Sequence, residues 1–278
     1  MKLDMNRAWS RVTTMLNSNR EIVLTISGLF FFLPYLAFVL LLPDVSTMFD
    51  QLAQSGDPMT EEQMNAFLAS LPAGFWIAVA ALGLVQATGV LSLLCLIGDS
   101  ARPTAGEAIR RGLAALPTYI GVLLLQMVAF MLAMVLPLGL TGATGNAFLT
   151  LLGMALALWI AVWLYARFSV VQPVIVSEKT FNPVSAMIRS WELTGGNAWR
   201  IVGFFLLLLI AYLVASAFVS LVFGLLFYVG GETVQTFGNA LVGAFTNAVG
   251  ITLMAAAVAA VHRQLAGIGR ETVDIPLG

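Results

Sequence analysis

Basic, acidic and aromatic side chains that could bind an anionic group gather between residues 167 and 200. The candidates are Arg167, Glu178, Arg189, Trp191, Trp199 and Arg200. One interpretation is structural: Arg167 and Glu178 form an ion pair across the end of an apolar stretch, and the tryptophans anchor at a membrane interface. The other is functional: Arg189 and Arg200 bind the phosphates of anionic lipids, as basic clusters beside membrane spans do. The two interpretations are compatible.

Side chains that carry enzyme chemistry are scarce. The single histidine, His262, stands beside Arg263 at the end of an apolar stretch, where a helix C-terminus favours positive charge and the ring would face the headgroups. The single cysteine, Cys95, lies in an apolar run, which predicts a packing role. The sequence has no glycine-rich phosphate-binding motif and no cluster with metal-ligand spacing. We therefore expect no catalytic residues, no metal, no cofactor and no enzyme activity.

Uncharged polar side chains interrupt the apolar stretches at Gln86, Gln126 and Asn247. Hydrogen bonds between helices, worth about 1 kcal/mol each, explain such residues. An alternative is a polar cavity lined by all three, which would suit transport of a solute. Ion coupling is not expected, because the interiors of the apolar stretches contain no acidic residue.

The composition places these residues in a membrane. Of the 278 residues, 60% are hydrophobic and 10% are charged, and the mean hydropathy is +0.95. A soluble domain carries about 25% charged residues, so a soluble fold is excluded, and so is disorder. Six stretches are long and apolar enough to span a bilayer as helices, at about 22–42, 73–98, 118–140, 147–170, 201–228 and 239–261.

The basic residues are distributed unevenly along the chain. All 13 lie in or beside the N-terminal tail, the second and fourth loops between spans, or the C-terminal tail. The first, third and fifth loops contain none of them; the first and fifth carry only acidic charges, and the third carries no charge. By the positive-inside rule, both termini lie in the cytoplasm.

A short amphipathic helix is predicted before each odd-numbered span, because apolar residues recur there every three or four positions. The chain is therefore predicted to be one membrane domain, 1–278. It would consist of three direct repeats, at about 1–99, 100–178 and 179–265, and a cytoplasmic tail, 266–278. The fold class is all-α integral membrane: six transmembrane helices as three direct repeats of a cytoplasmic amphipathic helix plus a helical hairpin.

Capping residues mark the starts of two of these helices. Thr104 followed by Glu107 fits a capping box, and Asn182 supplies an N-cap before a proline. The long first outer loop, 44–72, is expected to lie on the outer surface or to cap the bundle. A gating lid is the alternative interpretation of this loop.

The most specific string in the chain starts at Arg167, near a span end, and continues through Pro173 and Glu178. A Ser-Trp-x-Leu-Thr-x-Gly-x-x-Trp-Arg string, residues 190–200, then enters the fifth span. This pattern resembles the YciC-like bacterial inner-membrane proteins and the membrane domain fused to some glycerophosphodiester phosphodiesterases. The resemblance implies a six-span protein of the bacterial inner membrane without a settled biochemical activity. Phosphodiesterase activity is not expected, because this sequence has no soluble catalytic domain.

These observations favour a non-enzymatic inner-membrane protein that interacts with membrane lipids, including anionic phospholipid, or with partner membrane proteins. No nucleic-acid partner is expected. The alternative function is a transporter or channel for a small or lipid-like solute. It would require a continuous cavity past Gln86, Gln126 and Asn247.

Overall fold

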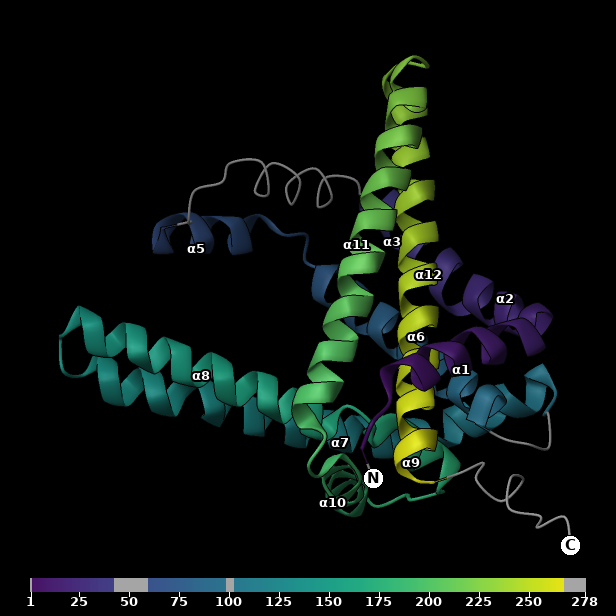
Figure 1. The fold of residues 1–278 in the computed structure, drawn as a ribbon. Coiled ribbons are helices and arrows are strands. Elements are labelled where there is room, and N and C mark those ends of the chain that lie inside the picture. The colour runs from purple at the N-terminus through teal and green to yellow at the C-terminus, as the bar shows by residue number, and fades with distance from the viewer. Residues whose placement is uncertain (1, 43–59, 99–102, 268–278) are drawn as a thin grey trace, which may run out of the picture.

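The computed structural model describes residues 2–42, 60–98 and 103–267, and every regular element in these ranges is a helix (Figure 1). Six segments are long and apolar enough to cross a membrane: Arg20–Leu41, Phe75–Gly98, Ala105–Gly142, Ala147–Ser177, Ala198–Tyr228 and Glu232–Leu265. The predicted all-helical class with six spanning helices is confirmed, and the chain is a multi-pass membrane protein. Residues 43–59, which include the first part of the outer loop 44–72, and the tail after 267 lie outside the described residues.

The first span is assembled from three helical pieces. A separate helix, α1 (Met5–Ser18), precedes it, and the span itself consists of α2 (Arg20–Ser27), the π-helical turn η1 (Gly28–Phe32) and α3 (Leu33–Leu41). The other described helices are α5 (Glu61–Ser70), α6 (Phe75–Gly98), α7 (Ala105–Gly142), α8 (Ala147–Phe168), α9 (Val171–Ser177), α10 (Pro183–Thr194), α11 (Ala198–Tyr228) and α12 (Glu232–Leu265).

The prediction of a separate amphipathic helix before the third span is wrong. Residues 105–142 form one continuous helix, α7, which begins at the predicted Thr104–Glu107 capping box and passes through Pro117. A proline removes the hydrogen bond to the carbonyl four residues earlier, and its ring crowds that carbonyl. The other backbone groups of a spanning segment must be bonded within it, so the helix continues past the proline. Separate helices do precede the first and fifth spans, and the three-repeat organisation is not confirmed.

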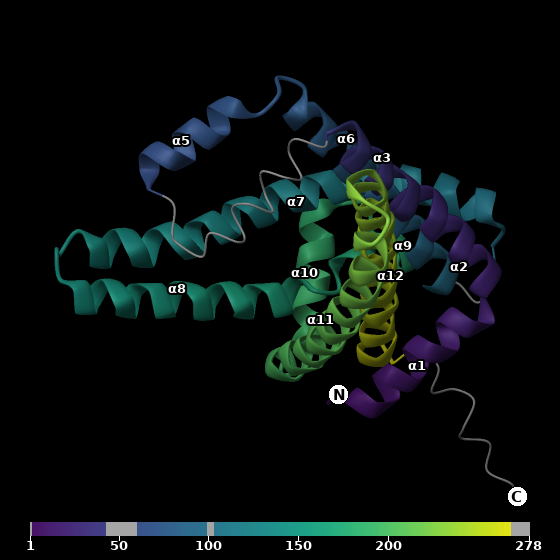
Figure 2. The ribbon, with the colours of Figure 1, turned by 90° about the horizontal axis from the view of Figure 1, so that it is seen from above.

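The hairpin of α7 and α8 and the hairpin of α11 and α12 point in different directions from a common base near α9 and α10 (Figures 1 and 2). The sixth span is the central one, since α12 contacts α1, α3, α6 and α11. In the most apolar 18 residues of α12, 56% of the residues are buried inside the protein. In the corresponding stretch of α11 the share is 11%. Small buried residues, Ala255 to Ala257 and Ala259 to Ala260, allow this close helix approach.

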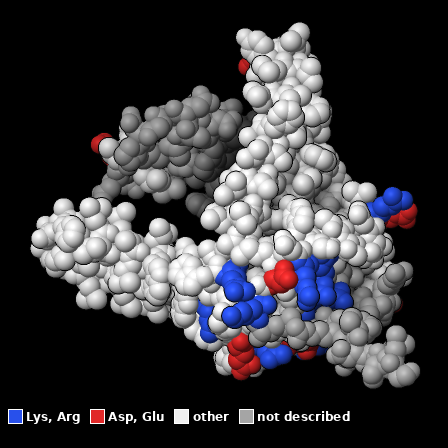
Figure 3. Space-filling view, viewed as in Figure 1, with Lys and Arg blue, Asp and Glu red and all other residues white. Residues whose placement is uncertain are grey.

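Charged side chains collect at the base where the hairpins meet. In Figure 3 the Lys, Arg, Asp and Glu atoms gather around the level of α9 and α10, and the two hairpins that project from this base are almost entirely uncharged. An apolar surface of this extent is stable against lipid chains. The base therefore contains the residues from which a polar site can be built.

The buried face of α10 is not its apolar stripe. Val184 and Ile188 belong to the stripe of apolar residues that recurs every three or four positions, and both side chains are more than half exposed. The buried residues are Ala186, Ser190 and Thr194. Since lipid is as apolar as a protein core, the apolar stripe can face outward, while the small and hydroxyl side chains contact the protein.

Candidate functional site

Two hydroxyl groups fasten α10 to the end of α8. Ser190 Oγ donates to the backbone carbonyl of Arg167 at 2.8 Å, and Thr194 Oγ1 lies 3.1 Å from the same oxygen. Carbonyls in the last turn of a helix have no partner within the helix, so these bonds satisfy an exposed acceptor. The Ser and Thr of the string 190–200 therefore position the last turn of α8 and the side chain of Arg167.

The guanidinium of Arg167 lies between aromatic rings. Its central carbon is 4.3 Å from the ring centroid of Trp191 and 5.6 Å from that of Trp163. The two indole rings meet edge to face, with centroids 4.9 Å apart. Nε of Arg167 is buried and has no hydrogen-bond partner among the described residues. The aromatic rings hold the guanidinium in place, but they do not neutralise its charge.

A cavity of about 440 Å³ opens beside Arg167. It is lined by Arg167, Arg200, Trp163 and Trp199, together with Gly195, Gly196 and Ala198. None of these lining residues is acidic. We call this the Arg167–Arg200 cavity. It combines two cations with two indoles, the combination found where a membrane protein meets lipid headgroups.

The predicted ion pair between Arg167 and Glu178 is wrong. Glu178 instead accepts from Arg189, with Oε2 2.8 Å from its Nε, and its Oε1 lies 3.0 Å from Nε2 of His262. Arg189 also reaches Glu192 at 3.4 Å. Because two carboxylates already neutralise Arg189, it is a poor candidate for the lipid phosphate site assigned to it from sequence.

The environment of Glu178 favours its ionised form. Burial raises the pKa of this carboxyl, but the hydrogen bonds with Arg189 and His262 and the positive charge of Arg189 outweigh burial, so the pKa lies below its usual value. The hydrogen bond with Glu178 in turn raises the pKa of Arg189, against a smaller opposing effect of burial. The two groups therefore remain a charged pair at neutral pH.

The position of His262 at a helix end predicted that its ring faces the headgroups. That prediction is wrong. Its side chain is 1% exposed and packs in the base of the protein against Glu178. Sequence reasoning missed this partnership, and the only available signal was a lone polar ring that follows a long run of small residues. Such a ring requires a buried partner.

The N-terminal segment closes one side of the base. Leu3 is buried, its N–H donates to Oδ1 of Asn197 at 2.8 Å, and its carbonyl accepts from Nη1 of Arg200 at 3.1 Å. The side-chain amide of Gln264 faces the N–H and C=O of Asp4, at 2.8 and 3.1 Å in the orientation that satisfies both. Arg200 thus donates one hydrogen bond to the backbone carbonyl of Leu3. A guanidinium has five N–H donors, so others remain for a ligand in the Arg167–Arg200 cavity.

The polar residues of the spans occupy different places. Asn247 donates to the carbonyl of Phe31 in η1 at 3.4 Å, which joins the sixth span to the first. Gln126 lines a cavity of about 220 Å³ together with Tyr119 and Gln172, and neither Gln86 nor Asn247 lines that cavity. Nε2 of Gln86 is buried without a hydrogen-bond partner in the described structure.

Candidate metal ligands do not cluster in this fold. Within residues 2–42, 60–98 and 103–267, no group of three His, Cys, Asp or Glu side chains could hold a metal ion. Cys95 is buried at the end of α6, and His262 contacts a carboxylate rather than a nucleophile. The arrangement at the base is suited to holding charge and to binding an anion.

A comparison with protein families gives one match, to the membrane domain of glycerophosphoryl diester phosphodiesterase. Residues 134–265 match this family. The resemblance predicted from the string 167–200 is confirmed, and the match extends from the last part of the third span through the sixth. It concerns a membrane domain, and the base residues of α8, α10, α11 and α12 all fall within it. Searches of curated proteins and of solved structures returned no match.

Proposed function

We propose that this chain is a non-enzymatic protein of the bacterial inner membrane that binds anionic phospholipid, with the lipid phosphate held in the Arg167–Arg200 cavity. The observation that supports this proposal is the pairing of two arginines, without an acidic lining residue, in one cavity of about 440 Å³. An arginine fork donates to two phosphate oxygens at once, so two such groups suit a phosphodiester.

The tryptophans support the same assignment. Trp199 is more than half exposed, and its ring centroid lies 6.3 Å from that of Trp159. Indole rings are enriched at the level of the headgroups, where one edge is wet and the other is apolar. The phosphate of a lipid bound beside Arg167 would then lie at the depth that these rings prefer.

The distribution of basic residues supports an orientation with both termini in the cytoplasm. In that orientation the Arg167–Arg200 cavity faces the cytoplasmic leaflet, whose anionic lipids attract basic segments. Partner membrane proteins are the other class of ligand that this surface could bind. We do not propose transport, because Gln126 lines a cavity that neither Gln86 nor Asn247 reaches.

The test is native mass spectrometry of the full chain, released from nanodiscs that contain equal amounts of phosphatidylglycerol and phosphatidylcholine. We expect wild-type protein to retain phosphatidylglycerol preferentially. Arg167→Gln and Arg200→Gln should each weaken this retention by about tenfold, the usual cost of a charged hydrogen bond.

The matched control is Arg110→Gln, since Arg110 is an exposed arginine on α7 that does not line the cavity. Its retention of phosphatidylglycerol should equal that of the wild type. Equal retention of both lipids by the wild type, or an equal loss in Arg110→Gln, would refute the proposal. Thermal unfolding of each variant shows whether a loss of lipid reflects a loss of fold.

A further inference from the structure

A cavity of about 220 Å³ lies where the α7–α8 hairpin meets α9 and α12. It is lined by the polar residues Tyr119, Gln126, Tyr165, Ser169 and Gln172 and by the apolar residues Phe130, Phe168, Val171, Met254 and Val258. We call it the Tyr119–Gln126 cavity. It has no lining residue in common with the Arg167–Arg200 cavity, so a ligand bound here is independent of the proposed function.

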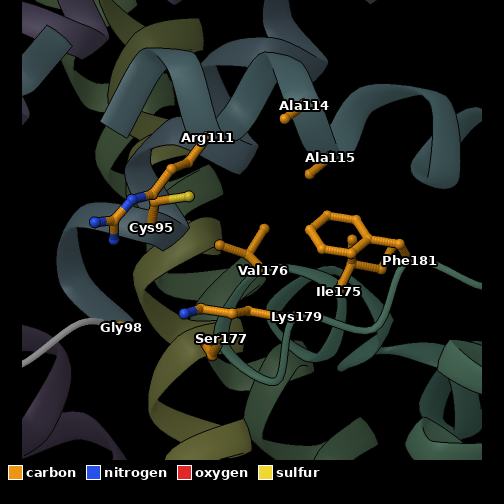
Figure 4. A pocket seen from close by; sticks show the side chains of 10 residues that line it. All are labelled: Cys95, Gly98, Arg111, Ala114, Ala115, Ile175, Val176, Ser177, Lys179 and Phe181. Atoms are coloured by element: carbon orange, nitrogen blue, oxygen red, sulfur yellow. The ribbon is translucent and has the colours of Figure 1, made fainter. Parts of the chain in front are cut away.

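The lining of the Tyr119–Gln126 cavity carries hydrogen-bonding groups but no charge. None of these lining residues is Asp, Glu, Lys, Arg or His. The cavity in Figure 4 differs in this respect: it lies nearer the start of α7, and the cationic residues Arg111 and Lys179 are among those that line it. An ion without an opposite charge is costly to bury at membrane depth. The Tyr119–Gln126 cavity therefore favours an uncharged ligand.

Two positions in this cavity keep hydrogen-bonding capacity for a ligand. At the first, Nε2 of Gln172 donates to the hydroxyl of Tyr119 at 2.8 Å. The hydroxyl proton of Tyr119 and Oε1 of Gln172 have no further partner among the described residues, so together they can bind a hydroxyl group as donor and as acceptor. At the second, the amide of Gln126 has no hydrogen bond within the described ranges, so its N–H groups can bind a carbonyl.

The two positions are separated along α7, which runs from the base toward the tip of its hairpin (Figures 1 and 2). Gln126 follows Tyr119 by two turns, about 10 Å along a helix, and the apolar Phe130 follows one turn later. A ligand therefore meets a hydroxyl site near the base, a carbonyl site further along the span and an apolar wall beyond it. An acylglycerol carries its free hydroxyl, its ester and its chain in this order.

The size and opening of the cavity fit the headgroup of a lipid rather than a whole lipid. Sites that enclose a drug-sized ligand have volumes of about 300 to 1,000 Å³, and this cavity is smaller. Tyr165 lines it and is 49% exposed, so the cavity opens to the surface of the protein. The chain of a bound lipid would then leave the cavity and lie against the uncharged surface of the hairpin (Figure 3).

We propose that the Tyr119–Gln126 cavity binds the uncharged headgroup of an acylglycerol. The free hydroxyl of the lipid accepts from the hydroxyl of Tyr119 and donates to Oε1 of Gln172. The ester carbonyl accepts from the amide of Gln126, and the chain continues past Phe130.

The test is the binding of tritiated 1-monooleoylglycerol to the immobilised full chain in a neutral detergent, with unlabelled lipids as competitors. We expect saturable binding that unlabelled 1-monooleoylglycerol displaces. Its ether analogue, 1-oleyl glyceryl ether, should displace the label about fivefold less effectively, because it lacks the carbonyl. Oleoyl lysophosphatidic acid carries the same ester with an added phosphate, and it should not displace the label.

Variants assign each end of the ligand. Gln126→Leu should remove the preference for the ester over the ether, whereas Tyr119→Phe should weaken the binding of both by about fivefold and keep the preference. Gln86→Leu is the matched control, since it makes the same substitution in a spanning helix outside the cavity, and it should keep both the affinity and the preference. Arg167→Gln should leave the binding of 1-monooleoylglycerol unchanged, so this proposal and the proposed function can fail separately.

The proposal is overturned if 1-monooleoylglycerol does not bind saturably, or if lysophosphatidic acid displaces it as well as the unlabelled ester does. It is also overturned if Gln126→Leu keeps the preference for the ester, or if Gln86→Leu or Arg167→Gln loses the binding. Thermal unfolding identifies any variant that does not fold, and the competition with wild-type protein decides the charge and ester requirements without a variant.

Discussion

Nε2 of His262 lies 3.0 Å from Oε1 of Glu178, although 84 residues separate them along the chain. The other carboxylate oxygen of Glu178 accepts from Arg189 at 2.8 Å. One carboxylate therefore connects the end of α9 to α10 and to α12, the central helix. Arg189, through which this carboxylate holds α10, lies on the helix that leads into the turn beside the Arg167–Arg200 cavity.

Loss of this carboxylate should destabilise the fold. We expect Glu178→Gln to lower the free energy of unfolding by about 1 to 2 kcal/mol, because the buried His262 and the partly exposed Arg189 both lose their charged partner. The measurement is unfolding in mixed micelles by added SDS, followed by circular dichroism. Glu192→Gln is the matched control, since its ion pair with Arg189 is exposed, and it should cost less than about 0.5 kcal/mol. Equal losses in both variants would contradict this role of Glu178.

Acid should weaken the same connection. The pKa of Glu178 in the folded protein is below the ordinary glutamate value of 4.5, so folding favours its ionised form. The stability it contributes is fully present above pH 4.5 and is lost as the pH falls through the lower folded pKa. We expect the melting temperature of the wild type to fall more steeply below this pH than that of Glu178→Gln. Parallel curves for the two proteins would show that Glu178 does not contribute.

Close packing of α6 on α7 should depend on Gly112. A Cβ atom there would lie 2.3 Å from Oγ of Ser92 and 2.8 Å from its backbone nitrogen, so the helices would have to separate. We expect Gly112→Ala to reduce stability by about 1 to 3 kcal/mol. Gly106→Ala on the same helix has no neighbouring atom within 4 Å and should stabilise slightly through helix propensity. SDS unfolding compares the two variants, and a stabilised Gly112→Ala would show that the contact tolerates a methyl group.

The hydroxyl groups of α10 should stabilise its contact with α8. Ser190→Ala and Thr194→Val each remove a bond to the Arg167 carbonyl, and we expect each to cost about 1 kcal/mol. In Thr14→Val the lost bond, to Ser10, lies within the exposed helix α1, so its effect should stay below about 0.5 kcal/mol. Both would be measured by SDS unfolding. An effect of Thr14→Val as large as that of Thr194→Val would show that the α8 contact adds nothing.

Sequence reasoning succeeded where the determining interactions are local. A span needs only a run of apolar residues, and all six were found. A cap needs residues three positions apart, and the capping box of Thr104 and Glu107 is present. Helix ends that extend into polar sequence were not predicted. For example, α12 begins at Glu232, whereas the span was predicted to begin near Asn239.

The interactions that build the site are not local, and sequence reasoning failed on several of them. Arg167 contacts two indole rings instead of Glu178, because α10 packs across the end of α8 and brings Trp191 there. The partner of Glu178 lies on the last span, and no spacing rule connects the two. The string 190–200 was correctly identified as informative, since its hydroxyl and indole residues all contact the base.

The docked N-terminal segment has a consequence for the order of events during synthesis. Leu3 precedes all six spans along the chain, yet its partners Asn197 and Arg200 lie at the start of the fifth span, and Gln264, which holds Asp4, lies at the end of the sixth. Chains are made and inserted from the N-terminus, so this contact forms only after every span has been translated. Protection of the segment around Leu3 and Asp4 from proteolysis should therefore arise only when the sixth span has been inserted, and its time course would report the completion of membrane assembly.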